Sequence, residues 1–437
     1  MRTAPREHSL VKVTPRRTSV PWPEAVVAHP LVQIAFGIGA AALVDINYAL
    51  LRSAQAVHWN DFGKFYYATQ NWETGSSIYA PTIATRMWMG SFWLQFLDMN
   101  PPHFHLLLVP LAMVSLETAA RIWLVANLAA AIAAITIVCH ELQLRVVRVH
   151  WLPFACLCLA SVATGANAVT GQCTGLLMLP MALAWRAARA NQWNTCGVWL
   201  GVLVSMKPFL GLFLPTLALL GRWRALRSLC VSGTVCALLG VLVFGWRSYI
   251  DWFDALRDVS WVWAAMNGSM RALITKSLAW SPFLTPVAMR PAWVTPLWIV
   301  GCAAVALVSA RTVRRSIEHA FSVTVLASLL MSPLGWTYYL WLAMPGCFAL
   351  WRVRMSAITW VGLLLLCVPL AGLTFGQPHP LATFIVGTSY SWGTLALWLG
   401  VVKQPAPAWS YGRSTARLSP TPVAASSNEP AAISTTA

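Results

Sequence analysis

The chain has 437 residues, of which 58% are hydrophobic and only 10% are charged, and it carries a net charge of +17. Soluble proteins contain roughly 25% charged residues, so this composition excludes an ordinary soluble protein of two or three domains. Apolar runs recur from residue 31 to residue 400, and many approach the roughly 20 residues that span a bilayer. The composition therefore predicts a polytopic membrane protein surrounded by the lipid bilayer.

The excess of Lys and Arg forms short clusters between the apolar runs. A nucleic-acid-binding protein needs a contiguous basic face, and the sequence has none, so we exclude nucleic acid as a partner. Short basic clusters are typical of cytoplasmic loops, and they predict that both chain ends are cytoplasmic. The clusters are Arg145/Arg148, Arg186/Arg189, Arg222/Arg224/Arg227, Arg311/Arg314/Arg315 and Arg352/Arg354.

Three regions follow from these patterns. Residues 1–30 are predicted as a cytoplasmic tail, residues 31–400 as the membrane domain, and residues 401–437, rich in Pro, Ser, Thr and Ala, as a disordered cytoplasmic tail. A first helix over 31–51 leads outward, and an outer loop over 52–103 follows it with only three basic residues.

The remaining chain alternates apolar stretches with short polar segments. A second outer loop, 247–291, is rich in Trp and Asp, and Pro208 directly after Lys207 predicts a break within an apolar stretch. The charge pattern requires that one of the stretches between 104 and 139 is not a full crossing. We predict an all-α bundle of about 11 to 13 transmembrane helices with interfacial helices in the first outer loop. The apolar stretches are 104–116, 119–139, 151–168, 173–190, 195–206, 208–220, 228–246, 292–310, 320–333, 338–350, 356–375 and 381–400.

The ten cysteines nearly all lie inside apolar runs, without the spacing of metal ligands. They are typical of small buried residues, so neither a disulfide framework nor a metal site is predicted. No other cofactor motif is present.

Acidic residues are scarce enough to be placed one by one, and six fall on the predicted outer face. A general base acting outside the membrane would be one of these six. Three of them share one helical face, which is typical of a solvated surface and also fits a metal or a sugar. The six are Asp61, Glu73, Asp98, Asp251, Asp254 and Asp258.

Asp61 has the most suitable surroundings of the six. It closely follows the first helix, and a carboxylate near the hydrocarbon boundary is partly desolvated, which raises its affinity for a proton. An Asp at this place is also a common helix start, and the residues alone leave both interpretations open. Its neighbours are His58, Trp59, Lys64, Tyr66 and Tyr67.

Two further polar features lie within apolar runs. Asp45 and Asn47 in the first helix are costly in lipid, so we expect them to face the protein interior or a cavity. Lys207 is the only basic residue deep in an apolar region, and it requires an anionic partner, either a lipid phosphate or Asp45. Both a functional and a structural interpretation of Lys207 remain open.

Short motifs recur in a fixed order along the membrane domain, and Pro and Gly within them also fit simple loop punctuation. Amides, hydroxyls and aromatic rings also suit a sugar pocket, in which ring faces stack on Trp or Tyr, at Asn100-Pro101-Pro102-His103, Gly171-Gln172, Asn267-Gly268-Ser269 and residues 332–339. The motifs are Asp61-Phe62 with Tyr66, Ala68, Gly75 and Tyr79; Pro101-Pro102 with Val109-Pro110-Leu111; Gly171-Gln172; Met206-Lys207-Pro208; Asn267-Gly268-Ser269-Met270; and Ser332-Pro333 with Trp336.

From about residue 31 to residue 400, this order resembles the family 87 glycosyltransferases, which are multi-spanning GT-C enzymes that use polyprenyl-phosphate sugars. The resemblance implies a GT-C-like fold and Asp61 as the catalytic base. Many members carry His after the Trp of the Ser-Pro element, whereas this chain has Tyr338 and Tyr339 there. Residues expected to bind the donor phosphate or sugar are Lys64, Tyr66, Tyr67, Gln172, Lys207, Asn267, Ser269, Arg271, Trp336, Tyr338 and Tyr339.

The function implied is inverting transfer of a mannose- or arabinofuranose-like sugar from a polyprenyl-phosphate donor to a glycolipid or cell-envelope glycan. We expect the reaction at the periplasmic or extracellular face of a bacterial inner membrane. A transporter or flippase for lipid-linked sugars would use the same cavity without covalent chemistry. The long polar first outer loop and the lack of transporter-like repeats favour the enzyme.

Overall fold

A computed structural model describes residues 29–54, 60–88, 93–95, 97–143, 152–257, 261–281, 284–352, 355–368 and 379–407. These residues form helices, apart from one short antiparallel pair of strands, so the predicted all-helical class is confirmed. Several predicted features lie outside the described residues: most of both tails, His58, Trp59, Arg145, Arg148, Asp258 and Arg354.

The elements follow one another with short connections. The first half of the chain holds α2 (Pro30–Ala54), α3 (Asn60–Glu73), η1 (Ile83–Thr85), β1 (Arg86–Trp88), β2 (Trp93–Gln95), η2 (Pro102–Leu107), α4 (Val109–Ala112), α5 (Leu116–Glu141), α6 (Leu152–Ala160), α7 (Val162–Thr170), α8 (Thr174–Arg189) and α9 (Trp193–Met206). The second half holds η4 (Pro208–Leu212), α10 (Phe213–Leu219), α11 (Trp223–Phe244), α12 (Arg247–Arg257), η5 (Trp261–Trp263), α13 (Met270–Leu278), η6 (Pro291–Trp293), α14 (Val294–Thr312), α15 (Ile317–Met331), η7 (Thr337–Ala343), α16 (Met344–Trp351), α17 (Ala357–Leu365), α18 (Pro380–Ala382), the π-helical η8 (Thr383–Gly387) and α19 (Ser389–Lys403).

Four helices of the described chain are long and apolar enough to cross a membrane, and the count is five if a pair bent by 40° near the end of the described residues is taken as one span. The other apolar segments are shorter or interrupted, so the count of 11 to 13 crossings stays a prediction. The long spans are Pro30–Ala49, Leu116–Glu141, Trp223–Phe244 and Pro291–Thr312, and the bent pair is Pro380–Gly387 with Ser389–Lys403.

Two sequence expectations about interrupted helices can be compared with the structure. The break at Pro208 is confirmed, because α9 ends at Met206 and Lys207 leaves the helical conformation with φ −136° and ψ 86°. The stretch 104–116 contains only the short elements η2 and α4, whereas α5 runs through Leu116–Glu141. The stretch that is not a full crossing is therefore 104–116.

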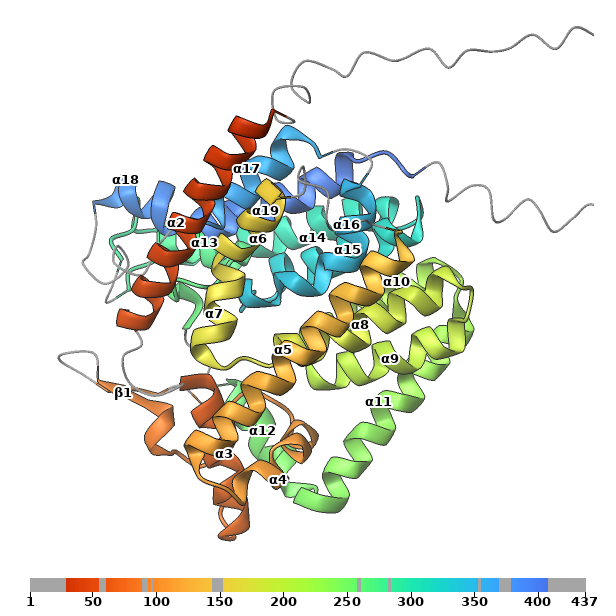
Figure 1. Cartoon of the computed structure of the whole chain (residues 1–437). Helices are drawn as coiled ribbons and strands as arrows, with labels where there is room; N and C mark the ends of the chain where they lie inside the picture. Colours follow the sequence, from red (N-terminus) through yellow and green to blue (C-terminus); the bar gives the residue numbers. More distant parts are fainter. Residues whose placement is uncertain are drawn as a thin grey trace, which may run out of the picture.

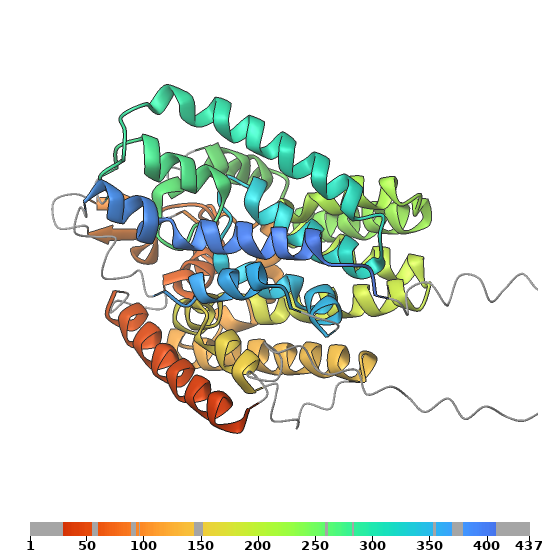
Figure 2. The ribbon, with the colours of Figure 1, turned by 90° about the horizontal axis from the view of Figure 1, so that it is seen from above.

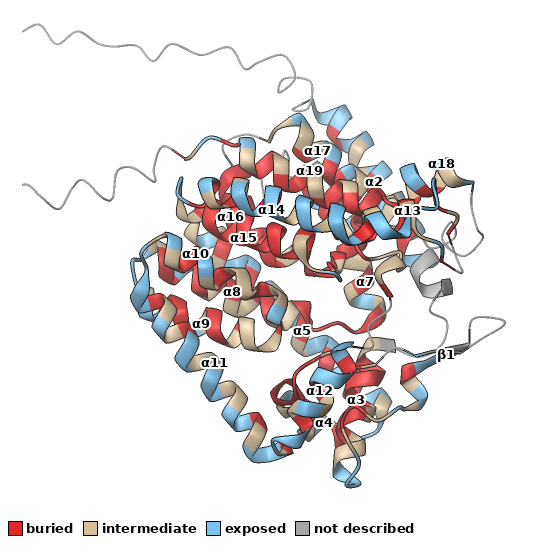
Figure 3. Ribbon diagram, turned by 180° about the vertical axis from the view of Figure 1, so that it is seen from behind, coloured by how far each residue is buried: buried red, intermediate tan, exposed pale blue. Residues whose placement is uncertain are grey.

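The helices stack with α15 in the interior and the long spans at the edges. Nearly every residue of α15 is buried, as Figure 3 shows in red, whereas α11 presents a largely exposed face. Figure 2 shows α2 and α14 at opposite edges of the stack. Both are apolar and mostly exposed, which suits helices that face lipid.

The two polar residues of α2 have different surroundings. Asn47 is buried, and its amide donates hydrogen bonds to the carbonyls of Ala160 at 2.8 Å and Cys367 at 3.0 Å. These bonds fasten α2 to the bundle, as polar side chains often do between membrane helices. Asp45 is exposed on α2, so the expectation that it faces the interior is wrong. Its position in the helical period, two residues from Asn47, turns it away from the bundle.

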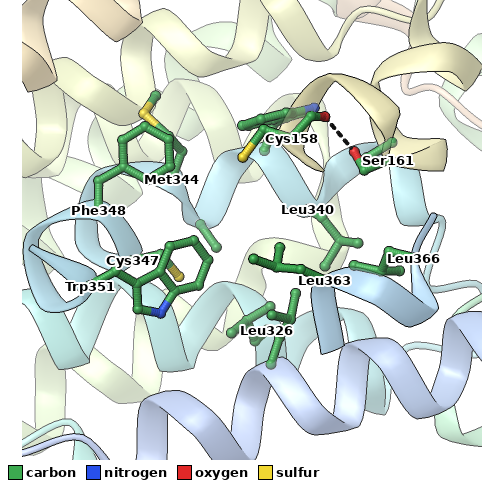
Figure 4. A pocket seen from close by; sticks show the side chains of 14 residues that line it. Cys158, Ser161, Leu326, Leu340, Met344, Cys347, Phe348, Trp351, Leu363 and Leu366 are labelled. Carbon is green, nitrogen blue, oxygen red and sulfur yellow. Dashed lines mark hydrogen bonds between the residues drawn. The ribbon is translucent and has the colours of Figure 1, made fainter. Parts of the chain in front are cut away.

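An apolar cavity of about 50 Å³ lies between α6, α16 and α17 (Figure 4). Cys158, Met344, Phe348, Trp351 and Leu363 line it. Its lining lacks charged side chains, so it does not contain the polar groups expected to react with a sugar.

The polar elements gather at one end of the molecule. Figure 1 shows α3, α4 and α12 together at its lower end. There α3 is fastened by ring contacts: Phe62 lies 5.6 Å from Trp123, and Phe65 lies 5.0 Å from Phe104, between ring centroids. Burying such rings stabilises α3 in one orientation and fixes its first turn.

The other end carries buried ion pairs. Arg189 at the end of α8 lies 3.1 Å from Glu141 of α5 and 2.7 Å from Glu318 of α15. Its guanidinium also stacks over Trp185 at 4.9 Å. One side chain thereby joins three helices, because a guanidinium carries five donors in a planar fork.

Candidate active site

Asp61 lies in the first turn of α3, and both of its carboxylate oxygens have partners. Oδ1 lies 2.5 Å from Nζ of Lys64, one turn further along the helix. Oδ2 accepts a hydrogen bond of 2.6 Å from Nε2 of Gln172. The Asp61 side chain is 16% exposed, so it is packed into the protein and still reachable from outside.

Gln172 is held between Asp61 and Tyr339. Its Oε1 accepts a hydrogen bond of 3.2 Å from the Tyr339 hydroxyl, while its Nε2 donates to Asp61. The preceding Gly171 has φ 68°, a left-handed conformation that ends α7 and that favours glycine. Trp123 donates to the Gly171 carbonyl at 2.8 Å and so fastens the turn. We call Asp61, Lys64, Gln172 and Tyr339 the Asp61 cluster.

Lys207 lies beside this cluster at the break after α9. It is 8% exposed, and its Nζ donates to Oδ1 of Asn100. The ammonium also lies over two rings, 5.3 Å from the centroid of Phe104 and 5.1 Å from that of Tyr339. Asp45, suggested above as a partner, is therefore not the residue that Lys207 contacts; its polar contacts are the neutral amide oxygen of Asn100 and the Cys173 thiol.

Asn100 in turn binds a buried carboxylate. Oδ1 of Asp98 accepts from the Asn100 backbone N–H at 2.8 Å and from its Nδ2 at 2.7 Å. Oδ2 of Asp98 lies 3.3 Å from Nε2 of His105, whose Nδ1 lies 3.2 Å from the Thr69 hydroxyl. Burial alone would raise the pKa of Asp98, but His105 and the Asn100 N–H lower it below its ordinary value. We call Asp98, Asn100, His105 and Lys207 the Asp98 cluster.

The loop that leads to Tyr339 is attached to a second loop by Asn267. Oδ1 of Asn267 accepts from the N–H groups of Ser269 at 3.1 Å and Gly335 at 2.9 Å. Its Nδ2 donates to the Pro333 carbonyl at 3.0 Å, and Ser269 donates to the same carbonyl at 3.2 Å. Asn267 and Ser269 are both 0% exposed, so they hold the loop that presents Trp336.

Comparison with known proteins decides the family. Residues 98–333, more than half of the chain, match glycosyltransferase family 87. The chain belongs to glycosyltransferase family 87. No curated protein and no solved structure was found to match it. Membership of an enzyme family decides between the two alternatives above in favour of the glycosyltransferase over the transporter.

The matched segment of this family 87 glycosyltransferase contains the whole Asp98 cluster and Gln172. Asp61 and Tyr339 lie outside it on either side. Gln172 is the residue that joins the two, because it hydrogen-bonds to both.

The aromatic residues named from the sequence lie around this site. Tyr338 packs 4.7 Å from Tyr339 and stacks on Trp336 at 5.7 Å with ring planes 11° apart. Tyr66 is buried and donates to the Val114 carbonyl at 2.7 Å, and Tyr67 packs against it at 5.4 Å. The buried Tyr338 and the half-buried Trp336 thus form a stacked aromatic pair next to Tyr339 of the Asp61 cluster.

Two basic residues on α13 have contacts of a different kind. Arg271 stacks over Trp298 of α14 at 4.8 Å. Lys276 is 1% exposed, and its Nζ lies 3.3 to 3.5 Å from three backbone carbonyls. Burial lowers the pKa of Lys276 to about 7. Among the described residues, neither contacts Asp61 or Gln172.

Elimination now separates the outer carboxylates. Asp251 accepts a hydrogen bond of 2.6 Å from Ser77, Asp254 forms an exposed pair with Arg257 at 2.8 Å, and Glu73 is exposed. Of the five outer carboxylates that the structure describes, Asp61 and Asp98 alone are packed among several polar side chains. Among the described residues, no three His, Cys, Asp or Glu side chains lie together as a metal site.

Asp98 was predicted as an outer carboxylate and Asn100 as part of a sugar pocket, but His105 and Thr69 were not predicted to have any role. The signal was the density of polar side chains over 98–105, directly before an apolar stretch. The contact with Lys207, more than a hundred residues away, depends on how η2 packs against α9 and α11, and residue spacing alone contains no such information.

Proposed function

We propose that this family 87 glycosyltransferase transfers a mannose- or arabinofuranose-like sugar from a polyprenyl-phosphate donor to a glycolipid or envelope glycan. The reaction would occur on the outer face of a bacterial plasma membrane. The observation that carries the proposal is a partly buried carboxylate, Asp61, linked through Gln172 and Tyr339 to a buried ammonium, Lys207. A base and a cation near one another are what a phosphate leaving group and a hydroxyl nucleophile require.

Asp61 is the proposed base. The acceptor hydroxyl attacks the anomeric carbon of the donor sugar, and its proton passes to Asp61. The bond between the anomeric carbon and the phosphate oxygen breaks on the opposite face, so the anomeric configuration is inverted. Lys64 and Gln172 hold the two carboxylate oxygens in a fixed orientation, which supports transfer of a proton over a short distance.

Lys207 is the proposed partner of the leaving phosphate. An ammonium has three donors, and the described polar contacts of Lys207 are the Asn100 oxygen and the Cys173 thiol, while its other contacts are ring faces. In a site shielded from water, such a charge stabilises the negative charge that develops on the phosphate oxygen. Trp336 and Tyr338 supply the aromatic faces on which a sugar ring stacks.

The remaining expected contacts have supporting roles in this proposal. Tyr66 and Tyr67 pack α3 so that Asp61 faces Gln172. Asn267 and Ser269 fix the loop of Trp336. Arg271 stacks on Trp298, so in this proposal it contacts the polyprenyl-phosphate sugar only on the side of the site formed by α13.

The test is Asp61→Asn in membrane vesicles supplied with a panel of radiolabelled polyprenyl-phosphate sugars. We expect transfer to fall by about a hundredfold or more while expression and donor binding persist, because the amide cannot accept the proton. Asp254→Asn, which removes an exposed outer carboxylate, is the matched control and should keep full transfer. Near-normal transfer by Asp61→Asn would show that another group is the base.

A further inference from the structure

We propose that Asp98 and Asn100 position Lys207 for the donor phosphate, with Asn100 acting as a neutral spacer between a carboxylate and the ammonium. This inference rests on the proposed role of Lys207 in donor binding. It assigns a positioning function to two residues that contact neither Asp61 nor Gln172.

The orientation of the Asn100 amide follows from its two neighbours. An ionised carboxylate can only accept hydrogen bonds, so the NH₂ group of Asn100 must face Asp98. An ammonium can only donate, so the oxygen must face Lys207. In the reverse orientation the amide oxygen would face the carboxylate of Asp98, and the NH₂ group would face the ammonium of Lys207. An acceptor would then meet an acceptor, and a donor would meet a donor. Asp98 therefore fixes the rotation of the amide and, through it, the direction of the Lys207 side chain.

Asp98 is itself held firmly. It is 3% exposed, and its second oxygen lies 3.3 Å from His105, which is completely buried. The Asn100 backbone is fixed as well, because Tyr79 donates to its carbonyl at 2.5 Å. Because the backbone and the NH₂ group of Asn100 are both held in place, its amide oxygen can occupy only one position.

A carboxylate in place of the Asn100 amide would compete with the donor phosphate for Lys207. An Asp directly bonded to Lys207 would form a buried ion pair and compete with the donor phosphate for the ammonium. The amide oxygen orients the ammonium without neutralising it. The negative charge of Asp98 stays two positions away along the chain, with its second oxygen 3.3 Å from the ring of His105. Lys207 thus keeps its charge available for an anionic guest.

The decisive experiment exchanges the two residues. The Asp98→Asn/Asn100→Asp double variant keeps composition, net charge and the hydrogen bond between positions 98 and 100, but it moves the carboxylate onto Lys207. We expect the KM for the polyprenyl-phosphate sugar, and the concentration of added polyprenyl phosphate that inhibits by half, to rise about 10-fold. We expect kcat to change far less, and a role in folding alone would not produce this split. Unchanged values of both would overturn the inference.

Controls separate this inference from the proposed function. Asn71→Asp adds a carboxylate to α3, where the Asn71 amide donates to the Ala80 carbonyl at 3.3 Å, and it should leave donor KM unchanged. Lys207→Ala should raise donor KM. If Lys207→Ala raises KM and the exchange does not, the positioning role is wrong and the proposed function stands. If Lys207→Ala has no effect on KM, both fail.

A second variant covers the case in which the exchanged protein does not fold. Asp98→Asn alone keeps the shape of the side chain but lets the Asn100 amide rotate, because the Asn introduced at position 98 can donate as well as accept. Donor KM should then rise about threefold with kcat retained. A KM equal to that of the unmodified enzyme would contradict the positioning role.

Discussion

At the scale of single residues, two neutral amides organise the site. Gln172 separates Asp61 from Tyr339, and Asn100 separates Asp98 from Lys207. Each amide has one donor side and one acceptor side, so each can join an acceptor to a donor without adding charge. The site therefore keeps its carboxylates and ammonium groups close together while, of the two ammonium groups, only that of Lys64 pairs directly with a carboxylate.

His103, next to this network, makes the enzyme sensitive to acid. It is 4% exposed, and its Nδ1 lies 3.0 Å from the Tyr249 hydroxyl. Burial, with a smaller effect of neighbouring His105, lowers the pKa of His103 from 6.5 to about 4. Below pH 6.5 the unfolded chain binds a proton that the folded chain does not. The contribution of His103 to stability is therefore complete above pH 6.5 and is lost as the pH falls to about 4.

We expect the unfolding temperature of the detergent-solubilised enzyme to fall between pH 6.5 and pH 4. Over this interval the free energy of unfolding of the His103→Phe variant should fall less than that of the unmodified enzyme, by a few kcal/mol, because phenylalanine has no proton to bind. Its unfolding temperature should therefore depend less on pH. His140→Phe, at an exposed position near the end of α5, serves as control. Equal slopes for His103→Phe and the unmodified enzyme would contradict this assignment.

At the scale of elements, the seam between α9 and α11 brings Lys207 into the site. Gly197 and Gly201 of α9 are four residues apart and face α11, where a Cβ at Gly201 would overlap with the Leu229 carbonyl and the Ser232 hydroxyl. Small residues at this spacing let two membrane helices approach closely. Lys207 follows α9 directly, so the seam also sets the distance from Lys207 to η2.

Gly201→Leu should destabilise the protein by about 2 kcal/mol or more, because the added side chain must push α9 away from α11. Donor KM should rise in parallel, since Lys207 moves with the end of α9. Gly211→Ala is the matched control, because a Cβ there meets no atom within 4 Å. Thermal unfolding in detergent and vesicle kinetics measure the two effects, and a stable Gly201→Leu variant would argue against a tight seam.

The predictable part of the fold was local. The break at Lys207-Pro208 was predicted because proline excludes the helical conformation of the residue before it. The buried position of Asn47 was predicted because an amide in lipid needs partners, but Asp45 followed the same rule and is exposed. Asp61, Gln172, Lys207 and Tyr339 were named from short motifs, and the structure brings them together. Their bonds connect distant segments, and no local pattern predicts such pairs.

At the scale of the whole molecule, polarity divides the bundle into two ends. Figure 1 shows α3, α4 and α12 at one end, and α3 carries Asp61. Arg189 with its two glutamates joins the last turn of α8 to the end of α5 and the first turn of α15. The basic clusters at the start of α11 and the end of α14 accompany the Arg189 end. By the distribution of positive charge, we expect the Arg189 end to be cytoplasmic.

Single-cysteine labelling tests this orientation. In a Cys230→Ala background, which removes an exposed native cysteine, Ser76→Cys after α3 should react with a membrane-impermeant maleimide added to intact cells. Arg224→Cys, exposed at the start of α11, should react only after permeabilisation. The background protein alone gives the baseline. Labelling of Arg224→Cys in intact cells would reverse the predicted orientation.

The junction at Arg189 has a mechanical consequence for substrate entry. The helices α8 and α15 are joined at this junction, and their opposite ends lead into the loops of Gln172 and Tyr339. Because the two helices are joined at Arg189, the loops of Gln172 and Tyr339 at their opposite ends form one wall of the site. Asp61 stands on α3, which packs against α5 through Phe62 and Trp123, and α5 carries Glu141 of the same junction. A large acceptor must therefore reach Asp61 with α3 held in place beside this wall, to which the hydrogen bond from Gln172 also joins it.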